Sequence, residues 1–296
     1  MSLAAAGEVP ESDSWYARLR TWWIILRVSL EERLVYRGDF ALGTLMRFLP
    51  IITQIFLWWA VFEAMVPADA SPEAAAQTSI QGYRYQDFVA YYLLTMLARA
   101  FSSMPALSSG IARQVREGEI KKFLVQPIDM IGFLLLSRVA HKVAYYSVAT
   151  GPFALVFFLC RGYFVQGWPD VVTMLAFVAS LIMAFLLGFF LESALGLASF
   201  WFLEVSSLLF VYMLFSFFLS GHMFPLDMLP EPWKTIVAWL PLRYLAYFPS
   251  AVFLKKITGT DLAVSLTVEL GWIVFLIWLN RFLWRRGVAR YSGFGG

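Results

Sequence analysis

Residues that commonly perform chemistry in proteins are scarce in this chain of 296 residues, which holds two histidines and one cysteine. His222 and Asp227, in the stretch SGHMFPLD, have an H-x-x-x-x-D spacing in which a carboxylate could orient an imidazole base for acyl transfer. Pro225 and the following MLPEPW favour instead a loop that contains short helices. An acyl- or glycosyltransferase therefore stays an alternative function, and no residue is assigned as catalytic.

Metal and redox chemistry are not indicated by the sequence. His141, His222 and Cys160 do not form a cluster with the spacing of metal ligands. Cys160 is the only cysteine, so it cannot form a disulfide within the chain, and its apolar surroundings, FALVFFLC, favour a packing role. We expect that this chain itself binds no metal and no cofactor.

An arginine lies in the middle of an apolar stretch. Arg99 is the twelfth of the 24 residues from Phe88 to Ile111, and no other charged residue occurs among them. An arginine in such a stretch is costly unless it faces protein, water or an acidic partner. Two interpretations stay open. Either Arg99 and Glu192 line a path for an anionic or polar substrate, or Arg99 forms a structural pair with Glu192, Glu204 or a backbone carbonyl group.

Long apolar segments must position these residues. Apolar residues make up 60% of the chain and charged residues 15%, and the mean hydropathy is +0.69. These values predict an all-α polytopic membrane protein rather than a soluble domain. The turn between the fourth and fifth segments, somewhere between Glu192 and Ser207, is the least defined boundary. We expect six transmembrane helices, each suited to a hydrocarbon core of ~30 Å: Phe40–Phe62, Phe88–Ile111, Val143–Cys160, Val171–Leu191, Val205–Gly221 and Leu262–Asn280.

Lys and Arg are distributed unequally between the two sides of these helices. One side has fifteen of them: Arg18, Arg20, Arg27, Arg33, Arg37, Arg113, Arg116, Lys121, Lys122, Arg138, Lys142, Arg281, Arg285, Arg286 and Arg290. The other side has six: Arg84, Arg161, Lys234, Arg243, Lys255 and Lys256. The positive-inside rule therefore predicts that both termini lie in the cytosol. The net charge of +3 follows from this asymmetry and does not indicate a nucleic-acid partner.

The segment before the first transmembrane helix combines aromatic residues with arginines. Residues 15–37, WYARLRTWWIILRVSLEERLVYR, predict an amphipathic helix that lies along the membrane surface near anionic lipid. A transmembrane helix is the alternative, and seven charges disfavour it. Residues 1–14 lack the features of a secretory signal and predict a disordered cytosolic tail. The apolar face of the surface helix should contain Trp15, Leu19, Trp22, Trp23, Leu26, Leu30 and Leu34.

A charged segment separates the second and third predicted transmembrane helices. From Gly110 to Asp129, apolar residues recur at helical spacing beside charged ones until Pro127 ends the pattern. We predict an amphipathic helix at residues 110–130. From the residues alone, this helix is a solvated element, a lipid anchor or a docking element for a soluble partner. Its charges of both signs disfavour pure attraction to lipid.

The same segment resembles a protein family. VREGEIKKFLVQPID, residues 115–129, is similar to the R-x-G-E/D segment, with following hydrophobic positions and a proline, of membrane permeases of the type-2 ATP-binding cassette (ABC) exporters. The resemblance is to a subgroup once classed as a domain of unknown function. The ending WRRGVARYSGFGG resembles its W-x-x-G-x-x-x-Y-x-x-x-G terminus. A further stretch resembles its loop between the last two transmembrane helices, at Gly221, Pro225, Leu226 and Pro230.

This resemblance implies the transmembrane permease subunit of an ATP-driven ABC exporter, which is a transporter and not an enzyme. The sequence contains no G-x-x-x-x-G-K-[ST] loop for phosphates. ATP and Mg²⁺ are therefore expected on a cytosolic ABC ATPase subunit, present in two copies. In such permeases the segment between the second and third helices receives the motion of the ATPase. The implied coupling residues are Arg113, Arg116, Glu117, Gly118, Glu119, Lys121, Lys122, Phe123, Leu124 and Pro127.

The resemblance also implies a dimer with a second permease copy or a related permease, in contact with the lipids of a bacterial plasma (inner) membrane. We expect one permease domain at residues 38–284, an extracytoplasmic loop with short helices at residues 220–260 and a cytosolic C-terminal tail at residues 285–296. The sequence does not determine whether the substrate is a drug, a lipid, a peptide or a glycan. The alternative is a membrane-embedded acyl- or glycosyltransferase that acts at the outer face.

Overall fold

The computed structural model describes most of the chain, namely residues 15–34, 37–67, 71, 78–126, 128–202 and 204–291. The side chains of residues 15–18 and 33–41 lie outside this description. The predicted tail at residues 1–14, the coupling residue Pro127 and residues 292–296 also lie outside the described residues.

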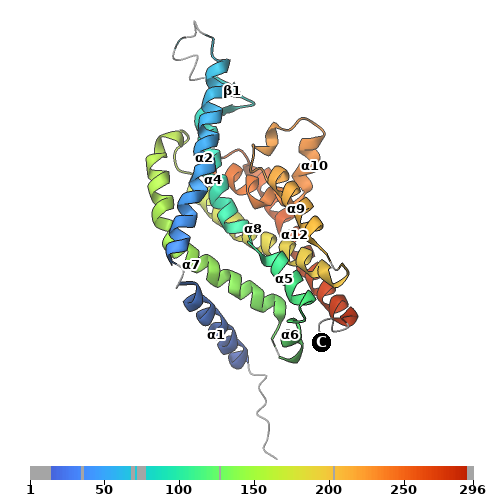
Figure 1. The fold of residues 1–296 in the computed structure, drawn as a ribbon. Coiled ribbons are helices and arrows are strands. Elements are labelled where there is room, and N and C mark those ends of the chain that lie inside the picture. Colours follow the sequence, from blue (N-terminus) through green and yellow to red (C-terminus); the bar gives the residue numbers. More distant parts are fainter. Residues whose placement is uncertain are drawn as a thin grey trace, which may run out of the picture.

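The described chain folds almost entirely into helices (Figure 1). The long helices are α1 (Trp15–Leu34), α2 (Arg37–Met65), α4 (Tyr85–Ser102), α7 (Met130–Leu159), α8 (Val171–Leu197) and α12 (Gly259–Arg290). The shorter ones are α5 (Leu107–Arg116), α6 (Lys121–Val125), η1 (Arg161–Tyr163), η2 (Ala198–Phe200), α9 (Ser206–Leu219), η3 (Leu226–Met228), α10 (Trp233–Trp239), η4 (Pro241–Leu245) and α11 (Tyr247–Phe253). Strands β1 (Ser79–Ile80) and β2 (Tyr83–Arg84) pair antiparallel, with Ser79 opposite Arg84 and Ile80 opposite Tyr83.

Two ends of the molecule can be distinguished in Figure 1. The terminal end holds α1, α6 and the last turns of α12, and the hairpin end holds β1, β2 and α10. The segment predicted as a loop with short helices, residues 220–260, contains η3, α10, η4 and α11. Residues 285–290, predicted as the start of a C-terminal tail, instead continue α12 to Arg290.

Helix α8 organises the packing. It contacts α4, α5, α11 and α12, and it carries apolar residues all around its axis, as a helix buried in protein and lipid requires. Gly188 and Gly196 bring its backbone close to its neighbours, because a Cβ atom at Gly188 would overlap the carbonyl oxygen of Ser102 in α4. A Cβ atom at Gly196 would lie 2.8 Å from Cβ of Ile111 in α5.

Among the described residues, four helices are long and apolar enough to cross a membrane: Leu42–Met65, Met130–Leu159, Val171–Phe200 and Gly259–Arg290. The expected count of six is not confirmed. The fifth predicted helix is α9, which is apolar but has 14 residues. The second, Phe88–Ile111, is divided into α4 and α5. The turn between the fourth and fifth lies between the end of α8 at Leu197 and the start of α9 at Ser206.

Pro105 explains the division between α4 and α5. Proline has no amide hydrogen to donate, and it disfavours the helical conformation at the preceding residue. α4 ends at Ser102, and Ala106 adopts a left-handed conformation with φ of 57° before α5 begins. The apolar length of this segment predicted one helix, but the backbone of residues 103–106 interrupts it.

Two basic side chains of α7 satisfy backbone groups at this interruption. Nζ of Lys142 donates to the carbonyl oxygen of Ala100, and to that of Ser103 at 2.8 Å. A guanidinium nitrogen of Arg138 donates to the carbonyl oxygen of Pro105 at 3.0 Å. Cations at the C-terminal end of a helix also complement its dipole. The α4–α5 break is thus held by α7.

Helix α1 packs along α7 at the terminal end (Figure 1). Ile24 and Val28, which lie outside the face expected from the sequence, are also apolar and are 50% and 58% exposed, so that single amphipathic face is not confirmed. The ring of Trp22 lies against Gly132 of α7, whereas Leu19 and Trp23 are 55% and 65% exposed. Apolar side chains therefore lie both on the side that contacts α7 and on a side open to the surroundings.

Candidate functional site

A cavity of about 450 Å³ lies beside the α4–α5 break. Its walls come from α2, α4, the break itself, α8, α9 and the loop after α9. It is lined by Arg47, Pro50, Ile51, Gln54, Tyr92, Thr95, Met96, Arg99, Ser103, Met104, Pro105, Glu192, Phe217 and His222. We call this space the break cavity.

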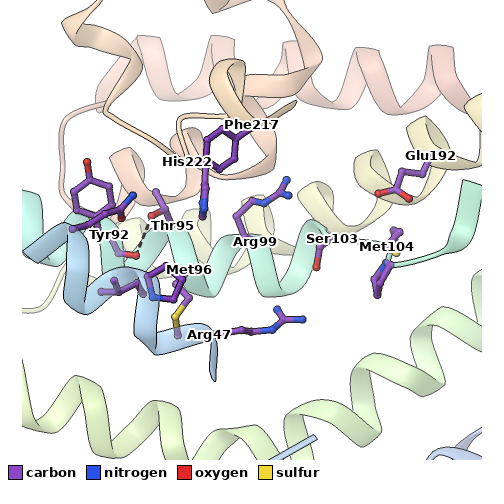
Figure 2. A pocket seen from close by; sticks show the side chains of 14 residues that line it. Arg47, Tyr92, Thr95, Met96, Arg99, Ser103, Met104, Glu192, Phe217 and His222 are labelled. Atoms are coloured by element: carbon purple, nitrogen blue, oxygen red, sulfur yellow. Dashed lines mark hydrogen bonds between the residues drawn. The ribbon is translucent and has the colours of Figure 1, made fainter. Parts of the chain in front are cut away.

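The break cavity brings together charged residues from three helices. Figure 2 shows the side chains of Arg47, from α2, and Arg99, from α4, extending in the same direction into the cavity. Glu192 of α8 lies on the side toward which they point, and His222 approaches beside Arg99. The sequence singled out Arg99 and Glu192 as candidates for a substrate path, and both line this cavity. It did not single out Arg47, although an arginine in an apolar segment was a visible signal.

Arg99 also lines a second, smaller cavity of about 210 Å³. The two cavities share Arg99, Met104, Pro105 and Glu192. In the smaller cavity a guanidinium nitrogen of Arg99 lies 3.4 Å from the hydroxyl oxygen of Ser216, to which it donates. Glu204, which the sequence left open as a partner of Arg99, does not contact it. Arg99 is therefore placed between two open spaces.

His222 and Asp227, the candidate catalytic pair, do not line the same cavity. His222 lines the break cavity, whereas Asp227 lines a different cavity, of about 420 Å³, at the hairpin end. The carboxylate of Asp227 accepts a hydrogen bond from the hydroxyl group of Tyr83 at 2.9 Å. The H-x-x-x-x-D spacing thus places the two side chains in separate surroundings, and this geometry does not support a base oriented by Asp227.

Tyrosines of α4 hold the loop that carries His222. The hydroxyl group of Tyr91 donates to the carbonyl oxygen of Gly221, and that of Tyr92 donates to the carbonyl oxygen of Met223 at 2.6 Å. Gly221 has φ of 80°, and a Cβ atom there would lie 2.5 Å from Cβ of Tyr247. Of the other loop residues in the motif, Pro225 and Leu226 are buried and Pro230 is exposed. The hydrogen bonds to Gly221 and Met223 thus hold the segment on either side of His222, which lines the break cavity.

The charged segment at the terminal end is not the single helix predicted for residues 110–130. α5 ends at Arg116, a turn follows at residues 117–120, and α6 then covers Lys121–Val125. Gly118 adopts φ of 77° in this turn, a conformation that side chains rarely allow. The direction of the chain thus changes in the middle of the predicted helix.

The coupling residues differ in accessibility. Gly118 is buried, and the side chain of Phe123 is only 8% exposed and packs on Phe133 with ring centroids 5.5 Å apart. Leu124 and Val125, by contrast, are 43% and 82% exposed. We define the α5–α6 surface by its exposed side chains: Arg113, Arg116, Glu117, Glu119, Lys121, Lys122, Leu124 and Val125.

The α5–α6 surface is tied to two other parts of the chain. Arg116 pairs with Glu204, at 3.4 Å, in the connection between α8 and α9. Hydrogen bonds from Ser206 hold the pKa of the Glu204 carboxyl below its ordinary value, and Arg116 adds to this effect. Just after α6, Asp129 accepts from the amide of Gly132 at 2.8 Å and so caps α7.

Asp129 also forms a two-point ion pair with Arg281 of α12, in which one nitrogen-to-oxygen distance is 2.9 Å. The sequence contains a signal for the cap, since aspartate is favoured immediately before a helix. It gave none for the pairing with a residue 152 positions away. These contacts connect the α5–α6 surface to α7, to α12 and to the connection before α9, so a displacement of this surface would also displace these elements.

Comparison with known families identifies one match. The model of a family described as ABC-2 family transporter protein matches residues 48–295. The matched region includes most of the break cavity and the whole α5–α6 surface. A search of curated proteins gives no match.

Proposed function

Because this chain belongs to the ABC-2 family of membrane transporter proteins, we propose that it is the permease of an ATP-driven exporter, which moves its substrate out of the cytosol. The observation that carries this proposal is the break cavity. Charged side chains are costly in hydrocarbon and are retained there mainly where they line a path or a water-filled space. Arg47, Arg99 and Glu192 line such a space between helices of the chain.

The proposal includes six membrane crossings with both termini in the cytosol. α4 and α5 together would form one interrupted crossing, and α9 would form a short one. Interrupted backbone is tolerated at membrane depth where it lines a cavity and its polar groups are satisfied. Lys142 and Arg138 satisfy the carbonyl groups at this break. The terminal end would then face the cytosol, in agreement with the excess of Lys and Arg there.

Accessibility of introduced cysteines tests this orientation. Cysteines at Ser71 and Glu231, in a background where Cys160 is replaced by serine, are expected to react in intact cells with a membrane-impermeant thiol reagent. A cysteine at Glu119 is expected to react only after the cells are opened, because the terminal end would be cytosolic. All three positions are exposed. Labelling of the Glu119 position in intact cells would show that the orientation is reversed.

In this proposal the α5–α6 surface is the docking site for the ATPase. Two copies of a cytosolic ABC ATPase, which bind ATP and Mg²⁺, would contact two permeases, either identical or related, in a bacterial plasma membrane. Charges of both signs on the α5–α6 surface suit the recognition of a specific protein partner. The exposed Leu124 and Val125 supply apolar contact area on this surface.

Copurification with an ATPase tests the exporter function. The tagged permease is expressed together with each ABC ATPase that is encoded near its gene, and it is expected to bind one of them and to change that enzyme's rate of ATP hydrolysis. An ATPase variant that lacks the lysine of its phosphate-binding loop should still bind but should not hydrolyse ATP. Failure of every adjacent ABC ATPase to associate, together with acyl transfer that depends on His222, would instead establish the transferase alternative.

A further inference from the structure

We propose that the break cavity binds the anionic head of an amphiphile, that is, a phosphate or carboxylate group joined to an apolar chain. This inference rests on the proposed permease function and adds to it the chemical class of the substrate. It is carried by the charge of the cavity, by the hydrogen-bonding capacity of its arginines and by its apolar walls.

The charge of the break cavity is positive. Its lining contains two guanidinium groups, those of Arg47 and Arg99, against a single carboxylate, that of Glu192. Even with Glu192 ionised, the lining retains an excess of positive charge. In the part of the chain that the structure describes, neither arginine lies within ion-pairing distance of a carboxylate. An anion would complete this arrangement, whereas a cation would be repelled.

The two arginines also retain hydrogen-bonding capacity. Arg99 makes one long hydrogen bond, to Ser216 at 3.4 Å, and Arg47 lies over the ring of Tyr145 at 5.3 Å from its centroid. A guanidinium group presents five N–H donors in a planar fork that matches the oxygens of phosphate or carboxylate. Lys142, by contrast, already donates to the carbonyl groups of Ala100 and Ser103. Arg47 and Arg99 are therefore the residues available to hold the head.

The remaining walls suit an apolar chain with a polar end. Ile51, Met96 and Phe217 provide apolar lining. On the polar side, Nδ1 of His222 is buried and has no hydrogen-bond partner among the described residues, so it can receive or donate a bond to a ligand. The volume of about 450 Å³ falls in the range of about 300–1,000 Å³ that is usual for small-molecule sites. A bare inorganic anion would leave most of this space and its apolar lining unused.

Binding of charge-matched probes tests the inference. The full-length permease, reconstituted in nanodiscs of phosphatidylcholine, is compared for dodecyl phosphate, laurate, dodecyltrimethylammonium and inorganic phosphate. Dodecyl phosphate and laurate are expected to bind at least about tenfold more tightly than the cationic probe, since a charge-assisted hydrogen bond is worth about that factor. Equal affinity for dodecyltrimethylammonium would overturn the assignment of an anion site. Inorganic phosphate that binds as tightly as dodecyl phosphate would show that the site takes a free anion and not an amphiphile.

Substitutions locate the binding to the break cavity. Arg47→Gln and Arg99→Gln are each expected to weaken dodecyl phosphate binding about tenfold, while Glu192→Gln should tighten it because the competing carboxylate is removed. The control is Arg161→Gln, at an exposed arginine outside both cavities, which should leave the affinity unchanged. Thermal unfolding without ligand verifies that each variant is folded. Unchanged affinity in folded Arg47→Gln and Arg99→Gln would refute the site, and the probe comparison on the unmodified protein stands even if a variant fails to fold.

The binding test and the exporter test fail independently. Binding requires no ATPase, so preferential binding of dodecyl phosphate without any ATP-dependent export would count against the exporter function and leave the anion site standing. Conversely, ATP-dependent export of compounds without an anionic group would support the exporter and refute the proposed substrate class.

Discussion

Replacement of both Leu124 and Val125 by aspartate is expected to abolish copurification of the permease with its ATPase while leaving the permease itself folded. On α6, Val125 is 82% and Leu124 43% exposed, so neither replacement opens a fully buried position. Loss of apolar anchors at the centre of an interface commonly costs about 2 kcal/mol or more each, and an added charge that must be desolvated increases this cost. The measurement is the yield of ATPase that copurifies with a tagged permease of verified stability.

Phe123→Ala distinguishes docking from folding. Because Phe123 is buried against Phe133, its truncation should destabilise the permease by about 3–5 kcal/mol. Any loss of the ATPase should then accompany a loss of folded permease. In the proposed docking site the apolar anchors are therefore Leu124 and Val125, whereas the sequence-based expectation included Phe123 among the coupling residues.

Charge reversal and a distant control complete this comparison. Glu119→Lys should weaken association by about 1–3 kcal/mol if the residue is desolvated in the complex. It should not affect folding, because the pair of Glu119 with Lys122 at 3.7 Å is exposed.

Val165→Asp, at an exposed valine between η1 and α8, is the matched control and should leave the association intact. The α5–α6 surface is not the docking site if two variants bind the ATPase normally: the double variant Leu124→Asp/Val125→Asp and the single variant Glu119→Lys. Sensitivity to Lys121 and Lys122 alone would indicate a lipid anchor.

Gly188→Val is expected to prevent accumulation of folded permease. At Gly188 a Cβ atom would overlap the carbonyl oxygen of Ser102, and both groups are backbone or attached directly to it, so no flexible side chain can yield. Overpacking in a close contact costs about 1–3 kcal/mol and occasionally more. Because Ser102 is the last residue of α4, the displacement would also distort the α4–α5 break and its cavity. Yield after solubilisation and the thermal unfolding midpoint measure the effect.

Gly271→Val provides the control for this prediction. Gly271 also lies inside a long helix, α12, so the change in intrinsic helix propensity is the same. No atom lies within 4 Å of the position that its Cβ would occupy. This variant should therefore accumulate and unfold like the unmodified protein. Equal behaviour of Gly188→Val and Gly271→Val would show that α4 and α8 do not depend on this contact.

The membrane class of this protein was predictable because it depends on local properties. The cost of placing polar groups in hydrocarbon adds up along contiguous residues, so composition and segment length identify apolar helices without knowledge of their neighbours. For the same reason, the sequence alone revealed that Arg99 is a charged residue within an apolar stretch and that basic residues are in excess at one end of the molecule. The interruption at Pro105 was also encoded locally, but the apolar length of residues 88–111 obscured it. The predicted count of six crossings is not confirmed, because among the described residues four helices are long and apolar enough to cross a membrane.

The composition of the candidate sites, by contrast, was decided by contacts between distant segments. Phe123 and Leu124 are both apolar, but as neighbours in α6 their side chains point about 100° apart, and packing against Phe133 of α7 buries only Phe123. Arg47 joins Arg99 only because α2 packs against α4. His222 and Asp227 are five residues apart in the sequence, yet the loop held by tyrosines of α4 directs them into different cavities. Spacing along a chain specifies proximity only within a regular helix or strand. In loops and between helices, the close packing of α8 against its neighbours determines which side chains meet.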